Sequence, residues 1–176
     1  MLSRLVEDLR TLALSESGTL RLQREATELG SLARDVASAY AGDAAARNVT
    51  LDVDAPEGLL SIDIDPVRIR EVISNLLANA LRHTPAGGVV ALRVATRRSG
   101  GLSVEVRDTG SGMTPDDLAH AFDRFFKGSQ SRGSGLGLTI ARNLVTAHGG
   151  EIHASSEPGR GTTIAFTLPG QSPPSG

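Results

Sequence analysis

One stretch in the second half of the chain, from Asp108 to Leu138, limits most strongly what this protein can fold into. It contains two glycine-rich segments and, between them, three of the four phenylalanines. Glycine adopts positive φ angles and lets a ligand approach bare backbone, so these segments can turn successive N–H groups toward phosphate oxygens. A helix expected from Leu138 to His148 would place the positive end of its dipole beside them. Either segment alone is equally compatible with an ordinary glycine-rich turn, but together they favour a site for a phosphorylated ligand.

The composition is that of a globular domain and argues against several classes of function. A chain of 176 residues is long enough for one domain with a hydrophobic core and an appendage. Its formal net charge is −2 and only 3% of its residues are aromatic, which argues against nucleic acid as the main partner. It has no cysteine for a disulfide or a thiolate metal site. No apolar run approaches the length of a membrane span, so we expect no membrane contact by this chain itself.

The periodicity of the apolar residues alternates along the chain between that of helices and that of strands. Helices are expected for the first dozen residues, for 29–47, from 66 to beyond 80, for 114–122 and for 138–148. Strands are expected for 19–24, 49–53, 60–64, 90–94, 102–106, 151–155 and 162–168. Helices interspersed with strands in this way predict a two-layer α/β sandwich.

The two ends of the chain differ from its middle. Leucines at positions 2, 5, 9 and 12 give the first helix a coiled-coil-like seam, but an isolated helix of this length is marginal in water. We therefore expect this helix either to dock on the main domain or to be the end of a longer helical hairpin. Residues 170–176 are rich in serine and proline and are expected to be disordered. The chain thus divides into an appendage over 1–18, a domain over 19–169 and a tail.

The third expected helix carries Asn75 and Asn79 four residues apart and therefore on one face. Glu71 lies one turn earlier on that face, and Arg82 and His83 lie one turn later. We expect this face to point away from the apolar stripe. Asparagine is a poor helix former, so two of them in mid-helix need a reason. Its amide oxygen is a neutral, hard ligand that suits Mg²⁺; the alternative is a solvated polar face.

Further candidates lie on either side of the first glycine-rich segment. Asp108 ends an expected strand, which places its carboxylate to accept a hydrogen bond from an exocyclic amine such as that of adenine; the alternative is an ordinary turn aspartate. Arg124 and Lys127 carry the charge to neutralise a terminal phosphate. Phe125 and Phe126 are either apolar anchors of a mobile loop or simple core residues.

The order of these motifs resembles that of the sensor histidine kinases. Residues 75–85, 108–112, 122–126 and 133–137 resemble the N box, the first glycine box, the F box and the second glycine box, and residues 159–163 resemble the third glycine box. The match runs roughly from Leu20 to Pro169. It implies the Bergerat-type ATP-binding fold shared with gyrase, Hsp90 and MutL. That fold is a mixed, largely antiparallel sheet covered on one face by helices, with ATP held under a lid between Met113 and Gly133.

The resemblance also implies a role for individual residues. Asn79 would hold Mg²⁺, Asp108 would read adenine and Thr162 would support the adenine end. Asn75, Arg124 and Lys127 would act at the transferred phosphate. The implied ATP-binding residues are Asn75, Asn79, Arg82, His83, Asp108, Gly110, Gly112, Met113, Phe125, Gly133, Ser134, Gly135, Leu136, Gly137, Leu138 and Thr162.

The chain departs from a complete kinase because none of its histidines fits the family's phosphoacceptor, a histidine followed by an acidic residue. His83 belongs to the N box, His120 to a solvated helix position and His153 to an alternating strand. His148 fits a helix C-terminus, where imidazole meets the dipole. The resemblance thus implies a catalytic domain alone, with residues 1–18 as the end of a dimerisation hairpin.

The implied activity is transfer of the γ-phosphoryl group of Mg-ATP to a histidine on a dimerisation domain outside this chain. A response regulator would be a further partner, and the location would be cytoplasmic even if the parent kinase is anchored in a membrane. An ATPase of the gyrase kind is an alternative, but it has a glutamate where Asn75 stands, and an amide cannot deprotonate water. Glu71, one turn away, keeps that alternative open. A serine kinase of the same fold is disfavoured by the Phe-rich box, and a nucleotide-gated binding module by the intact motifs.

Overall fold

The computed structural model describes residues 2–126 and 135–170, with the side chains of residues 2–5, 8 and 16 excepted. The helices are α1 (Leu2–Glu16), α2 (Leu29–Ala46), α3 (Pro66–His83), α4 (Pro115–Ala119) and α5 (Gly137–Ala147). The strands are β1 (Glu25–Thr27), β2 (Thr50–Asp54), β3 (Ile62–Ile64), β4 (Val89–Thr96), β5 (Leu102–Asp108), β6 (Ile152–Glu157) and β7 (Gly161–Leu168). The order of helices and strands is the one that the sequence predicts.

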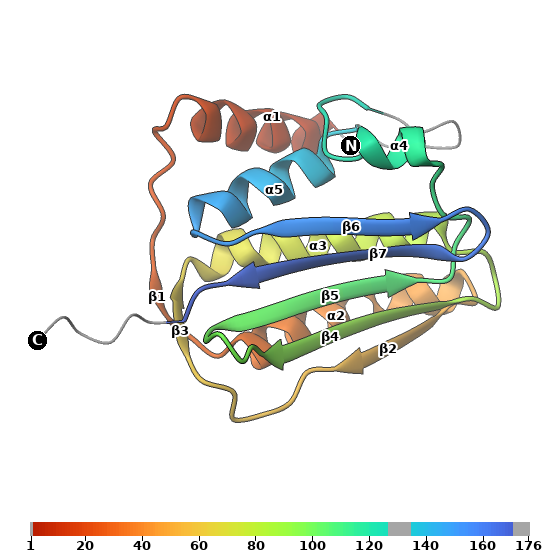
Figure 1. Cartoon of the computed structure of the whole chain (residues 1–176), viewed down its shortest axis with the longest axis horizontal. Coiled ribbons are helices and arrows are strands. Elements are labelled where there is room, and N and C mark those ends of the chain that lie inside the picture. The colour runs from red at the N-terminus through yellow and green to blue at the C-terminus, as the bar shows by residue number, and fades with distance from the viewer. Residues whose placement is uncertain (1, 127–134, 171–176) are drawn as a thin grey trace, which may run out of the picture.

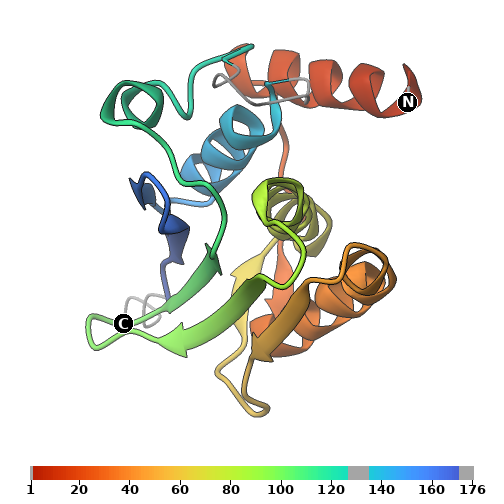
Figure 2. The ribbon, with the colours of Figure 1, turned by 90° about the vertical axis from the view of Figure 1, so that its right-hand side faces the viewer.

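The larger sheet has the strand order β2-β4-β5-β7-β6, and β1 pairs separately with β3. β2 and β4 run parallel, whereas β4, β5, β7 and β6 pair antiparallel in turn. Helices α2, α3 and α5 cover one face of this sheet, and α1 lies outside α5 (Figure 1, Figure 2). The predicted two-layer sandwich, with a mixed and largely antiparallel sheet covered on one face by helices, is confirmed.

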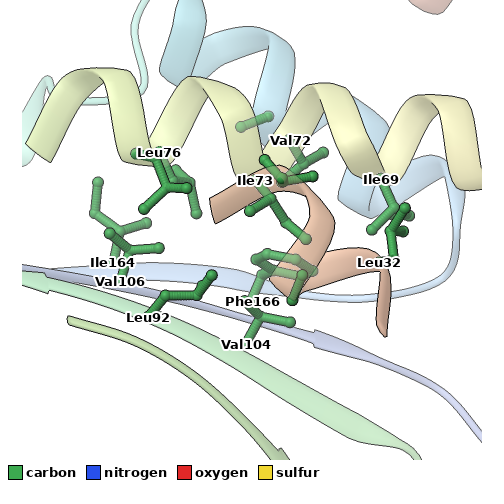
Figure 3. Packing of buried hydrophobic residues seen from close by; sticks show 14 of the residues in the cluster. Leu32, Ile69, Val72, Ile73, Leu76, Leu92, Val104, Val106, Ile164 and Phe166 are labelled. Atoms are coloured by element: carbon green, nitrogen blue, oxygen red, sulfur yellow. The ribbon is translucent and has the colours of Figure 1, made fainter. Parts of the chain in front are cut away.

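The core lies between α3 and the covered face of the sheet (Figure 3). Apolar residues of α3 at helical spacing face alternate residues of the three central strands, so both periodicities meet in one layer. The labelled residues of α3 are Ile69, Val72, Ile73 and Leu76, and those of the strands are Leu92, Val104, Val106, Ile164 and Phe166. The apolar stripe predicted for α3 is therefore confirmed. The packing of this stripe fixes the distance of α3 from the sheet and its rotation about its own axis, and α3 carries the two asparagines.

The first predicted strand, over 19–24, is wrong. The strand in this part of the chain is β1, and it begins only at Glu25, where it pairs with Ile64 of β3. The preceding segment is extended but bonded to other groups: the Gln23 N–H donates to Asp65 Oδ2 at 2.9 Å. The Arg24 guanidinium donates to the carbonyl oxygens of Asp63 and Ala147. These bonds go to the N-cap of α3, to β3 and to the end of α5 rather than into a strand ladder, so alternation of apolar residues alone could not distinguish this segment from a strand.

Helix α1 docks on the domain through its second half. Leu12 is only 5% exposed, and the neighbouring Thr11 Oγ1 accepts a hydrogen bond from Arg68 Nη1 of α3 at 3.3 Å. Leu9 and Val6 are 42% and 57% exposed. Of the two arrangements expected for this helix, docking on the main domain is therefore present. It involves Leu12 of the predicted seam, whereas Leu9 stays exposed. The predicted disorder of the tail concerns residues that, except for Gly170, lie outside those described.

His148 joins the end of α5 to the start of α3. Its Nε2 accepts the Asp65 N–H at 3.1 Å, so Nδ1 must carry the proton that it shares with the Leu144 carbonyl oxygen at 2.7 Å. The predicted position at a helix C-terminus is confirmed, but the ring is 1% exposed and neutral. Burial lowers the pKa of His148 below its usual value of 6.5, and Arg24 acts in the same direction, against the bond to Leu144 and the charge of Asp65.

We expect this histidine to make the fold sensitive to mild acid. Well above pH 6.5 it is neutral in both states and contributes no pH dependence; as the pH falls through that value the unfolded chain takes up the proton first, so the free energy of unfolding falls. The loss from one such group is at most about 1.4 kcal/mol per pH unit. Urea unfolding from pH 7.5 down to about 5 measures it. His148→Gln, which keeps an acceptor for Asp65, should have a shallower slope, and an unchanged slope would contradict the assignment.

Candidate functional site

A pocket of about 270 Å³ opens where β5 ends, beside the last turns of α3 and below α4. In Figure 1 the carboxyl ends of β5 and β6 lie on the side of the sheet where α4 stands. Seven lining residues are among those proposed from the sequence: Asn79, His83, Asp108, Gly112, Met113, Leu138 and Thr162. Six others are not among the ATP-binding residues implied by the sequence: Ser111, Thr114, Asp117, Ala121, Phe126 and Pro158. Tertiary folding thus brings residues of the N box, of the first and third glycine boxes and of the F box to one cavity, together with Leu138, which directly follows the second glycine box.

Asp108 lies at the base of the pocket and is 4% exposed. Its Oδ1 accepts the N–H groups of Gly110 at 2.8 Å and of Thr162 at 3.2 Å. Because both bonds use the same oxygen, Oδ2 is left to accept a hydrogen bond from a ligand. Burial raises the pKa of Asp108 above its usual 3.8, against the two backbone hydrogen bonds and the neighbouring His83. A buried carboxylate oriented in this way is suited to a ligand that donates hydrogen bonds.

The first glycine box serves mainly to bring backbone segments together. The Gly110 N–H bonds to Asp108, and a Cβ on Gly110 would overlap the His83 carbonyl oxygen. Gly112 has φ +69° and a Cβ there would overlap the carbonyl oxygen of Glu157, the last residue of β6 before the turn to β7. Gly112 lines the pocket, whereas Gly110 does not. The expectation that both glycines present N–H groups to phosphates is therefore wrong for Gly110, whose N–H orients the aspartate.

Gly112→Ala is expected to damage the pocket more than Gly159→Ala. Both residues have positive φ, +69° and +76°, so both variants bear a similar backbone strain. Only at Gly112 does the added methyl group meet another backbone segment; at Gly159 no atom lies within 4 Å of it. We expect nucleotide affinity to fall by roughly tenfold or more for Gly112→Ala alone, because displacement of this turn moves Met113 and Thr162. Calorimetric titration of both variants tests this, and equal losses would show that strain alone matters.

The two asparagines of α3 differ in their surroundings. Asn79 is half-buried and lines the pocket. Asn75 is 8% exposed and lies under the start of α5, where a Cβ on Gly137 would be 3.7 Å from its Cγ. The expectation that this face points away from the packed side of α3 is therefore wrong for Asn75, because α5 covers that flank of the helix. Asn75 does not line the pocket in this arrangement.

The residues around the asparagines are also placed. His83 lines the pocket, and burial lowers its pKa below 6.5 together with the charge of Arg82, against the charge of Asp108. Arg82 itself is exposed and lies outside the lining. Glu71 accepts a bond from Arg68 Nη1 at 3.0 Å, and the same Nη1 contacts Thr11 of α1. Glu71 is thus engaged in an ion pair within α3, next to the docked helix, and does not line the pocket.

Within the F box the roles of the phenylalanines differ from the prediction. Phe126 lines the pocket, whereas Phe125 is 61% exposed with φ +56°. Phe122 is half-buried, its carbonyl oxygen accepts from Thr139 Oγ1 at 2.9 Å, and the Arg142 guanidinium lies 5.8 Å from its ring centroid. Of the two anchors expected from the sequence, Phe126 therefore faces the pocket, whereas Phe125 is exposed and does not. Whether each phenylalanine of this short run is exposed or buried depends on the backbone conformation between them, which the sequence does not show.

The second glycine box is only partly described. Lys127, Gly133 and Ser134 lie outside the described residues. Gly135 packs against the backbone of Phe125, Leu136 is fully buried at the N-cap of α5, and Leu138 reaches the pocket. Arg124 lies on another cavity, of about 490 Å³, whose lining residues are Ser15, Arg124, Thr139, Arg142, Asn143, Thr146 and Ala147. The structure therefore separates Arg124 from Asp108, Asn79 and Thr162.

The donor set fits a magnesium ion held mostly by its ligand. Among residues 2–126 and 135–170 there is no cluster of three or more histidine, aspartate or glutamate side chains that could hold a metal by themselves. The pocket instead offers the amide oxygen of Asn79. Mg²⁺ commonly takes one or two protein oxygens and completes its shell with water and substrate phosphates. A single amide among the lining residues of the pocket is consistent with that use.

Comparison with known proteins gives a consistent result. The family described as histidine kinase-, DNA gyrase B- and HSP90-like ATPase matches residues 64–172. The chain is 34% identical over 168 residues, 94% of its length, to the adaptive-response sensory kinase SasA of Synechococcus sp. (strain JA-3-3Ab). It is 41% identical over 120 residues, 65% of its length, to the sensor histidine kinase WalK of Bacillus subtilis (strain 168).

A solved structure extends the similarity to the whole fold. The crystal structure of full-length ShkA in complex with AMPPNP matches 98% of this chain with a TM-score of 0.87 and 30% identity. The chain covers 36% of that ShkA chain, 45% of SasA and 20% of WalK. It therefore spans less than half the length of each of these relatives.

Proposed function

Because this chain belongs to the family of histidine kinase-, DNA gyrase B- and HSP90-like ATPases, we propose that it is the catalytic domain of a protein-histidine kinase. It binds Mg-ATP and passes the γ-phosphoryl group to a histidine outside these residues. The observation that carries this proposal is the buried Asp108, held by Gly110 and Thr162 at the base of a pocket that Asn79 also lines. The relatives named as sensory kinases support the choice of reaction.

In this proposal the two ends of the nucleotide bind to different parts of the pocket. The adenine amino group donates to Asp108, and Thr162 and Met113 line the same end. Asn79, with His83 beside it, lies toward the phosphates and Mg²⁺. Mg²⁺ supplies charge neutralisation for the transferred group when it is bound, so Asn79 need only hold it in place.

The transfer step needs positioning more than a catalytic base. The acceptor imidazole is itself the nucleophile, and the protein aligns it with the γ-phosphate and balances the charge. We assign Asn75, Arg124 and Lys127 to this end of the site. Asn75 lies near the start of α5 rather than in the pocket, so its role requires that the second glycine box and α5 adjust around the bound phosphates. Arg124 lines the cavity beside α5, and in this proposal it would meet the incoming acceptor there.

One observation bears on the ATPase alternative. Glu71, the residue that kept this alternative open, bonds to Arg68 at 3.0 Å and does not line the pocket. A carboxylate held by an arginine and pointing elsewhere is poorly placed to activate water. Phosphotransfer to histidine is therefore favoured over hydrolysis.

The partners follow from the reaction. A dimerisation domain, on the parent protein or a separate chain, would supply the histidine, and a response regulator would take the phosphoryl group from it. No helix in the described part of the chain is long and apolar enough to pass through a bilayer. We place the domain in the cytoplasm, where ATP and a response regulator are found, and expect no role for nucleic acid.

Phosphotransfer is tested by mixing the chain with γ-labelled ATP, Mg²⁺ and a separately produced histidine-bearing hairpin of its parent kinase. We expect acid-labile, alkali-stable label on the hairpin, and none when its histidine is replaced by glutamine. Steady release of phosphate into water without labelled hairpin would favour the ATPase alternative. Nucleotide binding with neither product would favour a nucleotide-gated module.

A further inference from the structure

Ser156 of β6 joins three groups at the base of the pocket, although it does not line the pocket itself. Its Oγ accepts the Met113 N–H at 2.8 Å, lies 2.9 Å from the Gly161 carbonyl oxygen and lies 2.9 Å from Thr162 Oγ1. Met113 and Thr162 both line the pocket, and Thr162 is only 6% exposed. One serine thus connects Met113, which directly follows the first glycine box, to Gly161 and Thr162 of the third.

The number of protons in this group determines which hydroxyl donates. A serine hydroxyl has one proton and two lone pairs. The Gly161 carbonyl oxygen has no proton, so the contact with it requires the proton of Ser156. One lone pair of Ser156 accepts from Met113, and the other remains for Thr162. All three contacts are satisfied together only when the Thr162 hydroxyl donates its proton to Ser156.

Donation of the Thr162 proton to Ser156 determines which hydrogen-bonding groups the pocket offers to a ligand. With its proton given to Ser156, Thr162 Oγ1 can only accept from a ligand. Its backbone N–H already donates to Asp108 Oδ1, which leaves Oδ2 of that carboxylate as a second acceptor. The base of the pocket then carries two adjacent acceptors. Such a pair attracts an amino group and repels a carbonyl oxygen.

We propose that Ser156 is a positioning residue that makes the pocket selective for 6-aminopurines over 6-oxopurines by taking the proton of Thr162. The inference rests on the proposed function, since it requires an adenine nucleotide at Asp108. Without the Ser156 hydroxyl, the Thr162 proton is released and can turn to donate to a carbonyl oxygen at the same place. Selectivity then falls even though no residue that touches the ligand has changed.

The test compares the affinities of ADP and inosine diphosphate, which has a carbonyl oxygen where adenine has the amino group. The wild-type chain should prefer ADP, and Ser156→Ala should lower the ratio of the two affinities by roughly five- to tenfold, the value of one net hydrogen bond. Ser156→Thr keeps a hydroxyl and should restore most of the ratio. Ser155→Ala, at the exposed neighbouring position on β6, should leave it unchanged.

An equal loss of affinity for both nucleotides in Ser156→Ala would mean that Ser156 only supports the fold, and the proposal would be wrong. If thermal unfolding shows that Ser156→Ala is not folded, Thr162→Val carries the test. It removes the acceptor without adding a donor, so ADP binding should weaken while inosine diphosphate binding does not; an unchanged ratio overturns the proposal. Failure of the wild-type chain to bind any adenine nucleotide would instead refute the proposed function.

Discussion

Asn79→Ala is expected to abolish Mg-dependent ATP binding while leaving the fold intact. Asn79 lines the pocket, and its half-buried side chain makes no part of the hydrophobic core below α3. Alanine also has the higher helix propensity, so α3 should persist. We expect affinity for Mg-ATP to fall by more than about 100-fold, or about 2.7 kcal/mol. Calorimetric titration with and without Mg²⁺ measures the loss, and circular dichroism checks the fold.

Asn143→Ala is the matched control for this variant. Asn143 is also a half-buried asparagine on a helix, but it lies on the other cavity, beside Arg124. Its replacement should leave Mg-ATP binding within about twofold of the wild type. An Asn79→Ala chain that binds Mg-ATP normally would refute the metal assignment. A chain that loses metal-free nucleotide to the same extent would mean that Asn79 contacts the nucleotide rather than Mg²⁺.

Asp108→Asn is expected to weaken adenine nucleotides selectively. The amide oxygen of asparagine can still accept from Gly110 and Thr162, which leaves its NH₂ group where Oδ2 faced the ligand. Two donors, the amide and the adenine amino group, then oppose each other. We expect a loss of roughly 1–3 kcal/mol in the binding free energy of ADP. Binding of inorganic triphosphate, which has no base, is the control, and equal weakening of both would refute the role in base recognition.

The same carboxyl group predicts how binding depends on pH. The ionised form accepts from the adenine amino group, so protonation of Asp108 should weaken ADP. Because burial raises the pKa of Asp108, this loss should begin at a higher pH than for an exposed aspartate, whose pKa is about 3.8. ADP titrations between pH 7.5 and 5 should show affinity falling toward acid in the wild-type chain. The part of the slope that disappears in Asp108→Asn belongs to this group.

Much of the fold follows from local pattern. The change from a 3.6-residue to a two-residue period located the helices and most strands, since burial on one face of each element imposes those periods. Asp65 and Pro66 marked the start of α3 because a side-chain acceptor and a missing N–H both suit a first turn. The strand placed at 19–24 failed because this segment bonds to Asp65 through the Gln23 N–H and to Asp63 through the Arg24 side chain instead of pairing in a ladder.

The sequence by itself also determined which chemistry the site can perform. The pattern consists of Asp108 at the end of a strand, Asn79 on α3 and the glycines around them. It can be recognised from the sequence without tertiary information. Only the tertiary structure decided how these residues are used. The Gly110 N–H donates to Asp108, Asn75 is covered by α5, and Phe126 rather than Phe125 lines the pocket.

Ser156 shows most clearly why the rest required the structure. It stands 48 positions after Asp108 in the numbering, on a strand whose alternating polar residues carry no motif of their own. Its importance comes from the pairing of β6 with β7, which sets Ser156 opposite Thr162 and thereby next to the hydrogen bonds of Asp108. Local sequence determines which groups a chain carries and where its elements run. The direction of a shared proton depends on which distant groups meet, and only the packed fold determines that.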